Sequence, residues 1–255
     1  KVFIDGKEGT TGLRIFDRLS QRADLQLLTL PERERKNPAL RRELLNSCDV
    51  AILCLPEDAA LEACEMVTEP HVRIIDPSTA HRIAEGWTYG LPEAFDGGFE
   101  AVKASKRVAV PGCHASGFIT LVAPLIREGI LKKDALLTCT SLTGYSGGGH
   151  KMIAQYESDY RDVTLKSPRL YALAQAHKHL PEMRHYTGLG TAPAFFPVVA
   201  DYFNGMLTAI SVFAEHLETG KTPDDIRALY QKRYPGPLVR YVEKMDENGY
   251  LSGGK

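Results

Sequence analysis

Short apolar runs alternate with helix-like segments along the first half of the chain. The runs cover residues 1–5, 25–30, 49–55, 71–76 and 107–110. After the first run, Leu13, Ile15, Phe16 and Leu19 recur at helical spacing, and residues 57–59 open a second helical pattern. Strands that alternate with helices predict a parallel, doubly wound α/β sheet. In such a sheet, ligands gather beyond the carboxyl ends of the strands.

A glycine-rich turn follows the first predicted strand, with the spacing Gly6-x-x-Gly9-x-x-Gly12. In a dinucleotide-binding βαβ unit, such glycines permit the tight turn and bring the backbone close to pyrophosphate. An ordinary βα turn is the alternative. We expect cofactor contacts from this turn and from the end of the third strand, at Gly6, Gly9, Thr10, Thr11, Gly12, Leu55 and Pro56.

The loop after the second strand bears on which dinucleotide binds. Such sites use an acidic residue there for the ribose of NAD, or arginine for the 2′-phosphate of NADP. Residues 31–36 hold both, because Glu32 stands beside three cations, Arg33, Arg35 and Lys36. The cations favour NADP, with Arg33 and Arg35 as its contacts. Glu32 leaves NAD open, and a solvated charged loop is the third interpretation.

Composition excludes several classes of protein. The 255 residues are enough for one large domain or for two ordinary domains with a core each. Lys and Arg number 31 against 32 Asp and Glu, which leaves no basic excess for nucleic acid. No apolar run approaches the ~20 residues that span a bilayer. Five scattered cysteines without a CxxC pair argue against a disulfide framework and a zinc site. We expect a cytoplasmic protein with no metal, no nucleic-acid partner and no membrane partner.

One cysteine stands between a predicted strand and a predicted helix. Pro111 and Gly112 end the run 107–110, and an apolar helical segment begins at or near Cys113. A thiol there lies near unpaired backbone N–H groups and the positive end of the helix dipole, and both favour the thiolate. Cys113 is therefore the candidate nucleophile, and an inert buried cysteine is the alternative.

A nucleophilic cysteine beside a nicotinamide cofactor predicts the interconversion of an aldehyde and an activated acyl group. The thiolate adds to the carbonyl carbon, and hydride passes between that carbon and the nicotinamide. His177 and His179 are candidate acid/base groups, would share a face of an extended segment, and have Glu182 nearby to orient one ring. A metal-binding pair lacks an obvious third ligand, and a solvent-exposed pair without a role is the other alternative. His114 receives a minor role, because neighbours on a helix point in different directions.

A second glycine-rich loop, residues 143–151, follows a strand-like run at 135–142 and precedes a predicted helix at 150–160. Its exposed N–H groups could bind phosphate or carboxylate, with Lys151 nearby. The alternative is an ordinary flexible loop.

Six motifs, spread from the N-terminus to Glu182, occur together in this chain. They are Gly6-x-x-Gly9-x-x-Gly12, Asp76-Pro77-Ser78-Thr79-Ala80-His81-Arg82, Tyr89-Gly90-Leu91-Pro92-Glu93, Pro111-Gly112-Cys113, Ser146-Gly147-Gly148-Gly149 and His177-Lys178-His179-x-Pro181-Glu182. On these motifs the chain resembles the N-acetyl-gamma-glutamyl-phosphate reductases in their shorter form, within the semialdehyde dehydrogenase superfamily.

The resemblance implies NADPH-dependent reduction of N-acetyl-L-glutamyl 5-phosphate to the 5-semialdehyde and phosphate, through a thioester on Cys113, in arginine biosynthesis. It implies His179 or His177 as the acid/base partner. Substrate or phosphate contacts are implied for Arg82, Ser146, Gly147, Lys151 and Glu182.

The fold that the resemblance implies is a Rossmann-type NADP-binding domain, residues 1–112, followed by a catalytic α+β domain with a mixed sheet, residues 113–255. The second sheet would help to build a homodimer or homotetramer. The apolar run 192–199 and the alternating run 206–214 suit that sheet.

The chain departs from the family pattern at two places. Longer members carry an arginine after the serine-glycine loop, where His150 and Lys151 stand here. Members also continue into a segment that returns to the cofactor domain, so we expect that segment to be absent or the ending Gly253-Gly254-Lys255 to be atypical.

Three other interpretations compete with this one. Aspartate-semialdehyde dehydrogenases share the architecture, but more often have asparagine where this chain has Gly112, and lack the pattern at 89–93. A cysteine hydrolase does not account for the glycine turn and five alternating strands. A non-catalytic NADP-binding regulator requires an inert Cys113.

Overall fold

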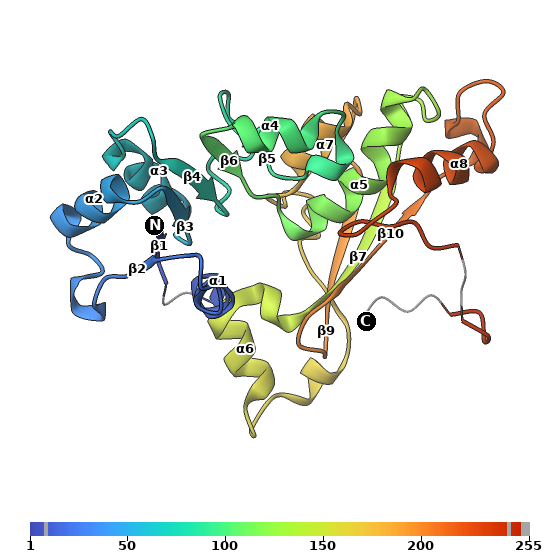
Figure 1. Cartoon of the computed structure of the whole chain (residues 1–255). Coiled ribbons are helices and arrows are strands. Elements are labelled where there is room, and N and C mark those ends of the chain that lie inside the picture. Colours follow the sequence, from blue (N-terminus) through green and yellow to red (C-terminus); the bar gives the residue numbers. More distant parts are fainter. Residues whose placement is uncertain (8–9, 244–245, 251–255) are drawn as a thin grey trace. The chain divides into compact units, whose positions relative to one another are not determined.

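The computed structural model describes residues 1–7, 10–243 and 246–250 (Figure 1). The chain forms two compact units. The first unit contains Lys1–Pro92 and Gly97–Gly112, and the second contains Glu93–Asp96 and Cys113–Lys255.

The described strands of the first unit form one parallel sheet in the order β2-β1-β3-β4-β6-β5. They are β1 (Val2–Asp5), β2 (Leu27–Leu28), β3 (Val50–Leu53), β4 (Arg73–Asp76), β5 (Thr88–Tyr89) and β6 (Arg107–Ala109). The helices are α1 (Thr10–Ser20), α2 (Pro38–Ser47), α3 (Glu57–Met66) and α4 (Gly98–Ala104), with 3₁₀ helices η1 (Glu32–Glu34) and η2 (Pro92–Ala94).

Apolar residues cover both faces of this sheet. Phe3 belongs to a core with Leu45 of α2 and residues of α3, whereas Ile4 packs with Phe16 of α1 on the opposite face. Strands β1 to β4 each contribute residues to both of these apolar cores, as expected where helices cover both faces of a sheet. The prediction of a parallel, doubly wound sheet is confirmed. Strand β5 is not predicted, because its two residues are too few to show a pattern.

Close backbone contacts require two glycines of the first turn. Gly6 has a φ of +83°, and a Cβ there would lie 2.3 Å from the carbonyl oxygen of Cys54. A Cβ on Gly12 would lie 2.4 Å from the carbonyl oxygen of Gly6. Only glycine permits this turn to fold against the end of β3 with α1 directly upon it.

A buried ion pair joins β1 to α2. Arg41 donates from Nε and Nη2 to Asp5 Oδ2 at 3.1 and 3.0 Å. Its Nη1 donates to Glu62 of α3 at 3.3 Å. Burial raises the pKa of Asp5, and the hydrogen bonds and charge of Arg41 oppose that rise. Arg41 therefore compensates for a carboxylate that the fold removes from water.

The described strands of the second unit form a sheet in the order β10-β7-β9-β8. They are β7 (Thr138–Gly144), β8 (Arg169–Leu170), β9 (Ala194–Ala200) and β10 (Met206–Ser211). The helices are α5 (Cys113–Arg127), α6 (Gly149–Glu157), α7 (Leu180–Thr187) and α8 (Pro223–Arg233), with 3₁₀ helices η3 (Tyr145–Gly148), η4 (Val163–Lys166) and η5 (Ala214–His216). Strands β7 and β9 are parallel and the other pairs antiparallel, so the predicted mixed sheet is confirmed.

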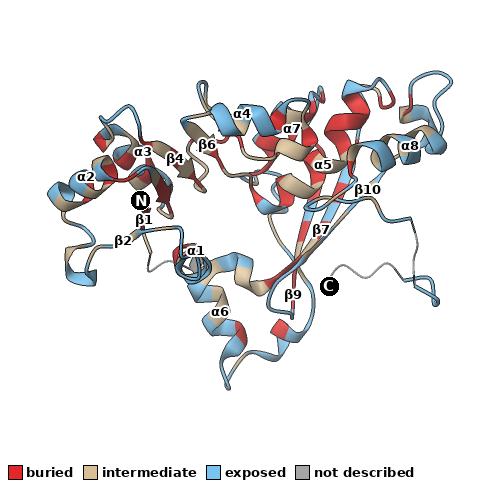
Figure 2. Cartoon of the chain, viewed as in Figure 1, coloured by how far each residue is buried: buried red, intermediate tan, exposed pale blue. Residues whose placement is uncertain are grey.

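The two faces of this mixed sheet differ. Cys139, Ser141 and Phe195 are buried on one face, and most of α5 is buried as well, in contrast to the solvated α8 (Figure 2). Residues in register across the strands share a face, so the opposite face carries three rows. We call these nine residues the outer face: Leu207, Leu142 and Val198; Ala209, Thr140 and Phe196; Ser211, Thr138 and Ala194. It carries no charged side chain, and seven of its residues are exposed.

Two arginines hold residues 93–96 in the second unit. Arg127 lies 4.2 Å from the ring centroid of Phe95 and donates to the carbonyl of Ala94 at 3.3 Å. Arg233 of α8 pairs with Asp96 and donates to the same carbonyl at 3.0 Å. This segment therefore joins the second unit, although it precedes residue 112.

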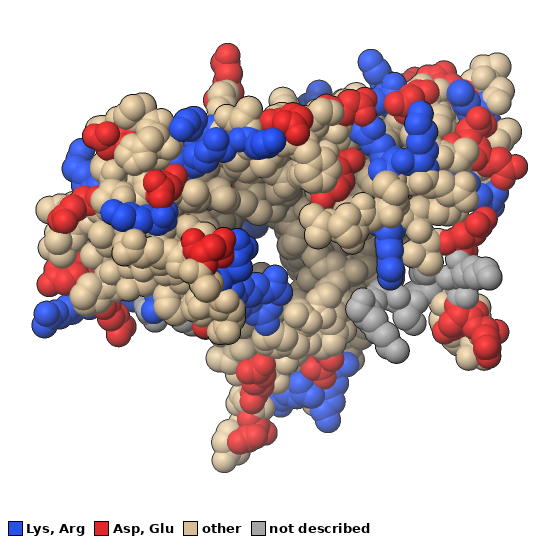
Figure 3. Space-filling view, in the orientation of Figure 1, with Lys and Arg blue, Asp and Glu red and all other residues tan. Residues whose placement is uncertain are grey.

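Acidic and basic side chains are interspersed over the face shown in Figure 3, in keeping with a net charge of −1. None of the helices within the described ranges has the length and apolar character that crossing a membrane requires.

Removal of Arg41 tests the buried ion pair. Arg41→Ala leaves Asp5 buried without its partner, so we expect the first unit to lose about 3–5 kcal/mol of unfolding free energy in urea titration. The matched control is Arg22→Ala, because Arg22 pairs with Asp24 at the surface; exposed pairs contribute about 0–1 kcal/mol. Equal losses in the two variants would contradict the assignment.

Candidate active site

Cys113 is the first residue of α5, and its side chain is exposed. The other four cysteines, all in the described part of the chain, are buried or half-buried. Burial raises the pKa of Cys54 and of Cys139 to about 12 and that of Cys64 to about 11, and it also raises the pKa of Cys48. These four are shielded thiols at neutral pH, which leaves Cys113 as the cysteine available for reaction.

His114 follows Cys113 and lies buried at the centre of a cluster of rings. Its Nδ1 is 2.7 Å from Ser141 Oγ of β7, and its Nε2 is 2.9 Å from the Tyr171 hydroxyl. Burial, with a smaller effect of the His177 charge, lowers the pKa of His114 to about 4, so the ring is neutral at pH 7. Three further rings have centroids 5.2, 5.6 and 5.7 Å from that of His114, those of Phe195, His179 and His177.

The two predicted acid/base histidines lie in a turn before α7, and not in an extended segment. His179 immediately precedes α7 with φ −90° and ψ −13°. Its N–H donates to Nδ1 of His177 at 3.2 Å, and the ring centroids are 4.6 Å apart with edge-to-face geometry. The two rings therefore lie close together because of this turn, and not because alternate residues of a strand share a face.

Gln175 fastens this turn to β9. Its Nε2 donates to the carbonyl of Phe195, and its Oε1 accepts from the Phe195 N–H, both at 2.7 Å. The Gln175 side chain thereby forms the two hydrogen bonds that the backbone of a neighbouring strand would form with Phe195. Ala172 and Gln175 have φ of 53° and 54°. This left-handed region costs non-glycine residues on the order of 1 kcal/mol or more, and such residues often occur in loops that a functional site holds in place. Sequence reasoning missed Gln175, because no local pattern marks its partner.

Glu182 is buried in the first turn of α7. Burial, with a smaller contribution from the Glu182 charge, raises the pKa of Tyr186 to about 12. The predicted roles of Glu182 in orienting a histidine and in binding substrate stay predictions.

The loop after β7 differs from an open anion-binding loop. The N–H groups of Gly144, Tyr145 and Ser146 donate to carbonyls of residues 202–205 at 3.0–3.1 Å. These amides are therefore occupied by the backbone, which corrects the expectation of exposed N–H groups at this end of the loop. Ser146 is half-buried and Gly147 exposed in η3, and Lys151 is exposed on α6.

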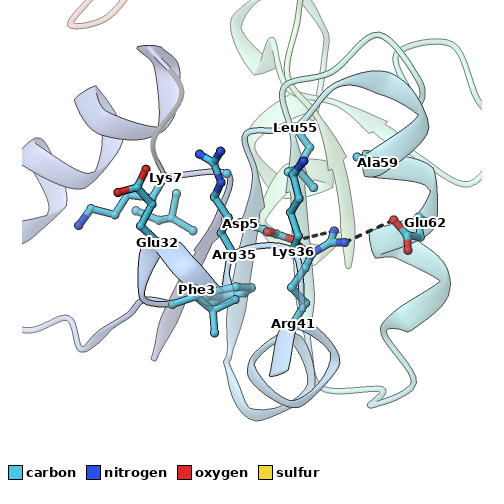
Figure 4. Close-up of a pocket in the computed structure, with 13 residues that line it drawn as sticks. Phe3, Asp5, Lys7, Glu32, Arg35, Lys36, Arg41, Leu55, Ala59 and Glu62 are labelled. Carbon is cyan, nitrogen blue, oxygen red and sulfur yellow. Dashed lines mark hydrogen bonds and ion pairs between the residues drawn. The ribbon is translucent and has the colours of Figure 1, made fainter. Parts of the chain in front are cut away.

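A cavity of about 580 Å³ lies in the first unit at the end of β1 (Figure 4). Of the predicted cofactor residues, Gly6, Arg35 and Leu55 line it, and Glu32 and Lys36 do so as well. Asp5, Arg41 and Glu62, which also line it, form the ion-pair network shown by the dashed lines. With those three charges paired, Arg35 and Lys36 supply positive charge beside the Glu32 carboxylate.

Two other predicted cofactor residues lie outside this lining. Arg33 and Pro56 are not among the described residues that line the cavity. The Arg33 side chain is 86% exposed, 4.0 Å from Glu34. Gly9 lies outside the described residues, as do the side chains of Thr10 and Thr11.

Arg82 is buried and joins two segments of the first unit. It donates to the carbonyl of Pro77 at 2.9 Å and to that of Val110 at 3.1 Å. Beside it, His81 lies 2.6 Å from Asp76 and stacks on Trp87. These contacts fix the segment after β4 against the end of β6. The predicted contact between Arg82 and substrate stays a prediction.

Solved structures with the same fold include aspartate semialdehyde dehydrogenases. The enzyme II from Vibrio cholerae, solved with ASA, aligns with a TM-score of 0.67 at 13% identity over 91% of this chain and 78% of that chain. The enzyme from Candida albicans, solved with NADP, aligns with a TM-score of 0.60 at 16% identity over 91% and 76%. At these identities the likeness establishes the fold alone.

Sequence comparison identifies the family. Residues 1–99 match the semialdehyde dehydrogenase NAD binding domain, and residues 113–250 match the semialdehyde dehydrogenase dimerisation domain. An N-acetyl-gamma-glutamyl-phosphate reductase of Rhizobium meliloti (strain 1021) is 43% identical over 99% of this chain and 82% of that protein. An N-acetyl-gamma-glutamyl-phosphate reductase 2 of Pseudomonas putida is 43% identical over 96% and 77%. The chain therefore belongs to the N-acetyl-gamma-glutamyl-phosphate reductase family of semialdehyde dehydrogenases.

Proposed function

We propose that this enzyme reduces N-acetyl-L-glutamyl 5-phosphate to N-acetyl-L-glutamate 5-semialdehyde and phosphate, with NADPH and through a thioester on Cys113. The observation that carries the proposal is the exposed Cys113 thiol at the first residue of α5, next to a cluster of three histidines. The names of relatives at 43% identity support the substrate.

The chain's own residues would perform the acyl transfer. The Cys113 thiolate attacks the acyl carbon, the C–S bond forms, and the bond to the phosphate oxygen breaks. When bound, the nicotinamide supplies hydride to the thioester carbon. His177 or His179 protonates the oxygen of the resulting tetrahedral adduct and removes that proton again as the C–S bond breaks and the thiolate leaves.

The first-unit cavity fits a dinucleotide. Its volume of about 580 Å³ falls in the range of cofactor sites, roughly 300–1,000 Å³. The positive φ of Gly6 and the contact of its backbone with residue 54 leave no room for a side chain at the turn. Arg35 and Lys36 would hold the 2′-phosphate of NADP, which supports NADP over NAD.

The outer face of the mixed sheet supports a homodimer or homotetramer. Its nine residues carry no charge, and Phe196 and Leu207 are 36% and 40% exposed. An apolar face of this kind on a domain of the dimerisation type fits a second copy of the chain.

We place this reaction in arginine biosynthesis, because the product is an acetylated glutamate semialdehyde. None of the five cysteines, all in the described part of the chain, is assigned to a disulfide, which fits a reducing compartment and supports the cytoplasm as the location.

Replacement of the nucleophile tests the mechanism. We expect Cys113→Ser to lose at least a thousandfold in kcat for phosphate-dependent NADP reduction with N-acetylglutamate 5-semialdehyde, on the order of what loss of a covalent nucleophile produces. NADPH binding, followed by fluorescence titration, should stay within about twofold. Unchanged turnover in this variant would exclude the mechanism.

The same assay with aspartate semialdehyde separates the alternatives. We expect the wild-type enzyme to prefer the acetylated substrate. A preference for aspartate semialdehyde would keep the thioester chemistry and overturn the substrate. NADPH binding without turnover of either substrate would favour a regulator.

The relative affinity for NADPH and NADH tests the proposed roles of Arg35 and Lys36. We expect Arg35→Ala and Lys36→Ala each to weaken NADPH about tenfold to a hundredfold, since a hydrogen bond between charged groups contributes about 1.5–3 kcal/mol. NADH binding should change little, because NADH has no 2′-phosphate. Arg33→Ala is the matched control, because its side chain points to solvent outside the cavity. Equal losses for NADPH and NADH would reject the NADP assignment.

A charge on the outer face tests the oligomer. We expect Phe196→Asp to shift the wild-type dimer or tetramer toward smaller species in sedimentation velocity, because an unpaired charge at the centre of an apolar interface is unfavourable. Val163→Asp, at a side chain of η4 that is 72% exposed, should leave the oligomer intact. An unaltered oligomer in both variants would place the interface elsewhere.

A further inference from the structure

Three kinds of partner follow one another along the edge of β9 that pairs with β8. The first is strand β8 itself, which ends at Leu170. The second is the Tyr171 N–H, which donates to the carbonyl of Pro197 at 3.1 Å. The third is the Gln175 side chain, which pairs with both backbone groups of Phe195 at 2.7 Å. A side chain therefore continues the edge pairing where the backbone has turned away.

Apolar burial contributes little to the position of the segment that Gln175 anchors. Residues 173–176 are all exposed, and the Leu173 side chain is 68% exposed. The backbone is also strained, because Ala172 and Gln175 have positive φ. The two short hydrogen bonds of the Gln175 amide offset that strain and favour one conformation of the segment.

Phe195 connects this anchor to the histidines. Its ring is buried and lies edge-to-face against the ring of His177, with the centroids 5.1 Å apart. The same ring lies 5.2 Å from that of His114. Gln175 therefore holds the backbone of Phe195, and the side chain of Phe195 packs against the histidine that stands two positions after Gln175.

The turn that follows Gln175 favours one protonation state of His177. The His179 N–H donates to His177 Nδ1 at 3.2 Å, and the Leu180 N–H donates to the carbonyl of His177 at 3.0 Å. A ring nitrogen that accepts a hydrogen bond carries a lone pair, so the first bond requires a neutral His177 with its proton on Nε2. Protonation of Nδ1 would break that bond. The conformation of the turn is thereby linked to proton binding at His177.

We propose that Gln175 is a positioning residue, whose pairing with Phe195 holds residues 175–179 in the turn that places His177 and His179 for proton transfer. Gln175 itself transfers no proton, because a side-chain amide does not titrate near neutral pH. Loss of the amide releases the segment and displaces both histidine rings. The inference rests on the proposed function only in taking one of the two histidines as the acid/base group.

Turnover of N-acetylglutamate 5-semialdehyde with NADP and phosphate gives the first test. Gln175→Met keeps the length of the side chain and removes both hydrogen bonds. We expect its kcat to fall about tenfold to a hundredfold, because small displacements of catalytic groups reduce rates to that extent. KM for NADP should stay within about twofold, because the cofactor cavity belongs to the first unit. Gln231→Met, at an exposed position of α8, is the matched control and should alter neither constant.

Two further variants separate the role of the amide from that of the backbone. Gln175→Asn carries the same amide on a side chain that is one methylene shorter, and Gln175→Gly relieves the strain of the positive φ. Neither can form both hydrogen bonds with Phe195, so each should lose about as much kcat as Gln175→Met. Wild-type kcat in either variant would overturn the proposal, because the backbone conformation alone would then position the histidines.

An NMR titration of the His177 ring gives the second test and needs no substrate. Loss of the hydrogen bond from the His179 N–H makes protonation of Nδ1 easier. We therefore expect the pKa of His177 to rise by about 0.5 to 1 in Gln175→Met. The titratable rings around His177 include those of His114, Tyr171 and His179, and this variant leaves all three in place.

A Gln175→Met enzyme that is folded by circular dichroism, with wild-type kcat and an unchanged His177 titration, would overturn the proposal. Normal turnover in both His177→Ala and His179→Ala would overturn the acid/base roles themselves, which is a failure of the proposed function. If the substrate assignment were wrong, the wild type would show no turnover, and the NMR titration would still decide whether Gln175 holds the turn.

Discussion

The close packing of α5 on the mixed sheet is the constraint on which the rest of the candidate active site depends. Gly117 lets the helix approach β10 until Thr208 fills the space of a missing side chain. At that separation His114 reaches Ser141, and the first residue of the helix, Cys113, is left exposed at its end. A larger residue at 117 would move the helix and would separate the hydroxyls from the imidazole together.

In the first unit, an ion-pair network joins the elements around the cavity. Asp5 lines its cavity, and burial disfavours the charged form of this carboxyl group. Arg41 of α2 offsets that effect by donating two hydrogen bonds to Asp5. The same guanidinium extends to Glu62 of α3. One side chain thereby connects a strand and two helices, and the remaining cations of the cavity are left for an anionic ligand.

Much of this architecture could be predicted from the sequence, because it depends on local patterns. The apolar runs locate β1, β3, β4 and β6, and the Pro111-Gly112 break locates the start of α5 at Cys113. Strand β2 is shorter than its apolar run, since only Leu27 and Leu28 pair with β1. The turn at Gly6 could also be predicted, because the spacing Gly6-x-x-Gly9-x-x-Gly12 directly after the first apolar run indicates a glycine-rich turn.

Features that depend on distant partners could not be predicted in this way. Residues 93–96 join the second unit because of Arg127 and Arg233, which lie more than thirty positions away. The central place of His114 depends on Ser141 and Tyr171, and the histidine turn depends on the pairing of Gln175 with Phe195. Side chains of adjacent helix residues point in different directions, but this rule does not predict which other segments of the chain pack against them.

The distribution of chemistry between the two units has a consequence for how the enzyme can change. Cys113, His114, His177 and His179 all belong to the second unit, and Arg35, Lys36 and the glycine turn all belong to the first. Under the proposed function, the nucleophile thus belongs to one core and the cofactor cations belong to the other. A substitution at Arg35 or Lys36 therefore replaces no side chain of the unit that contains Cys113, and the two sets of candidate residues are separate targets for engineering.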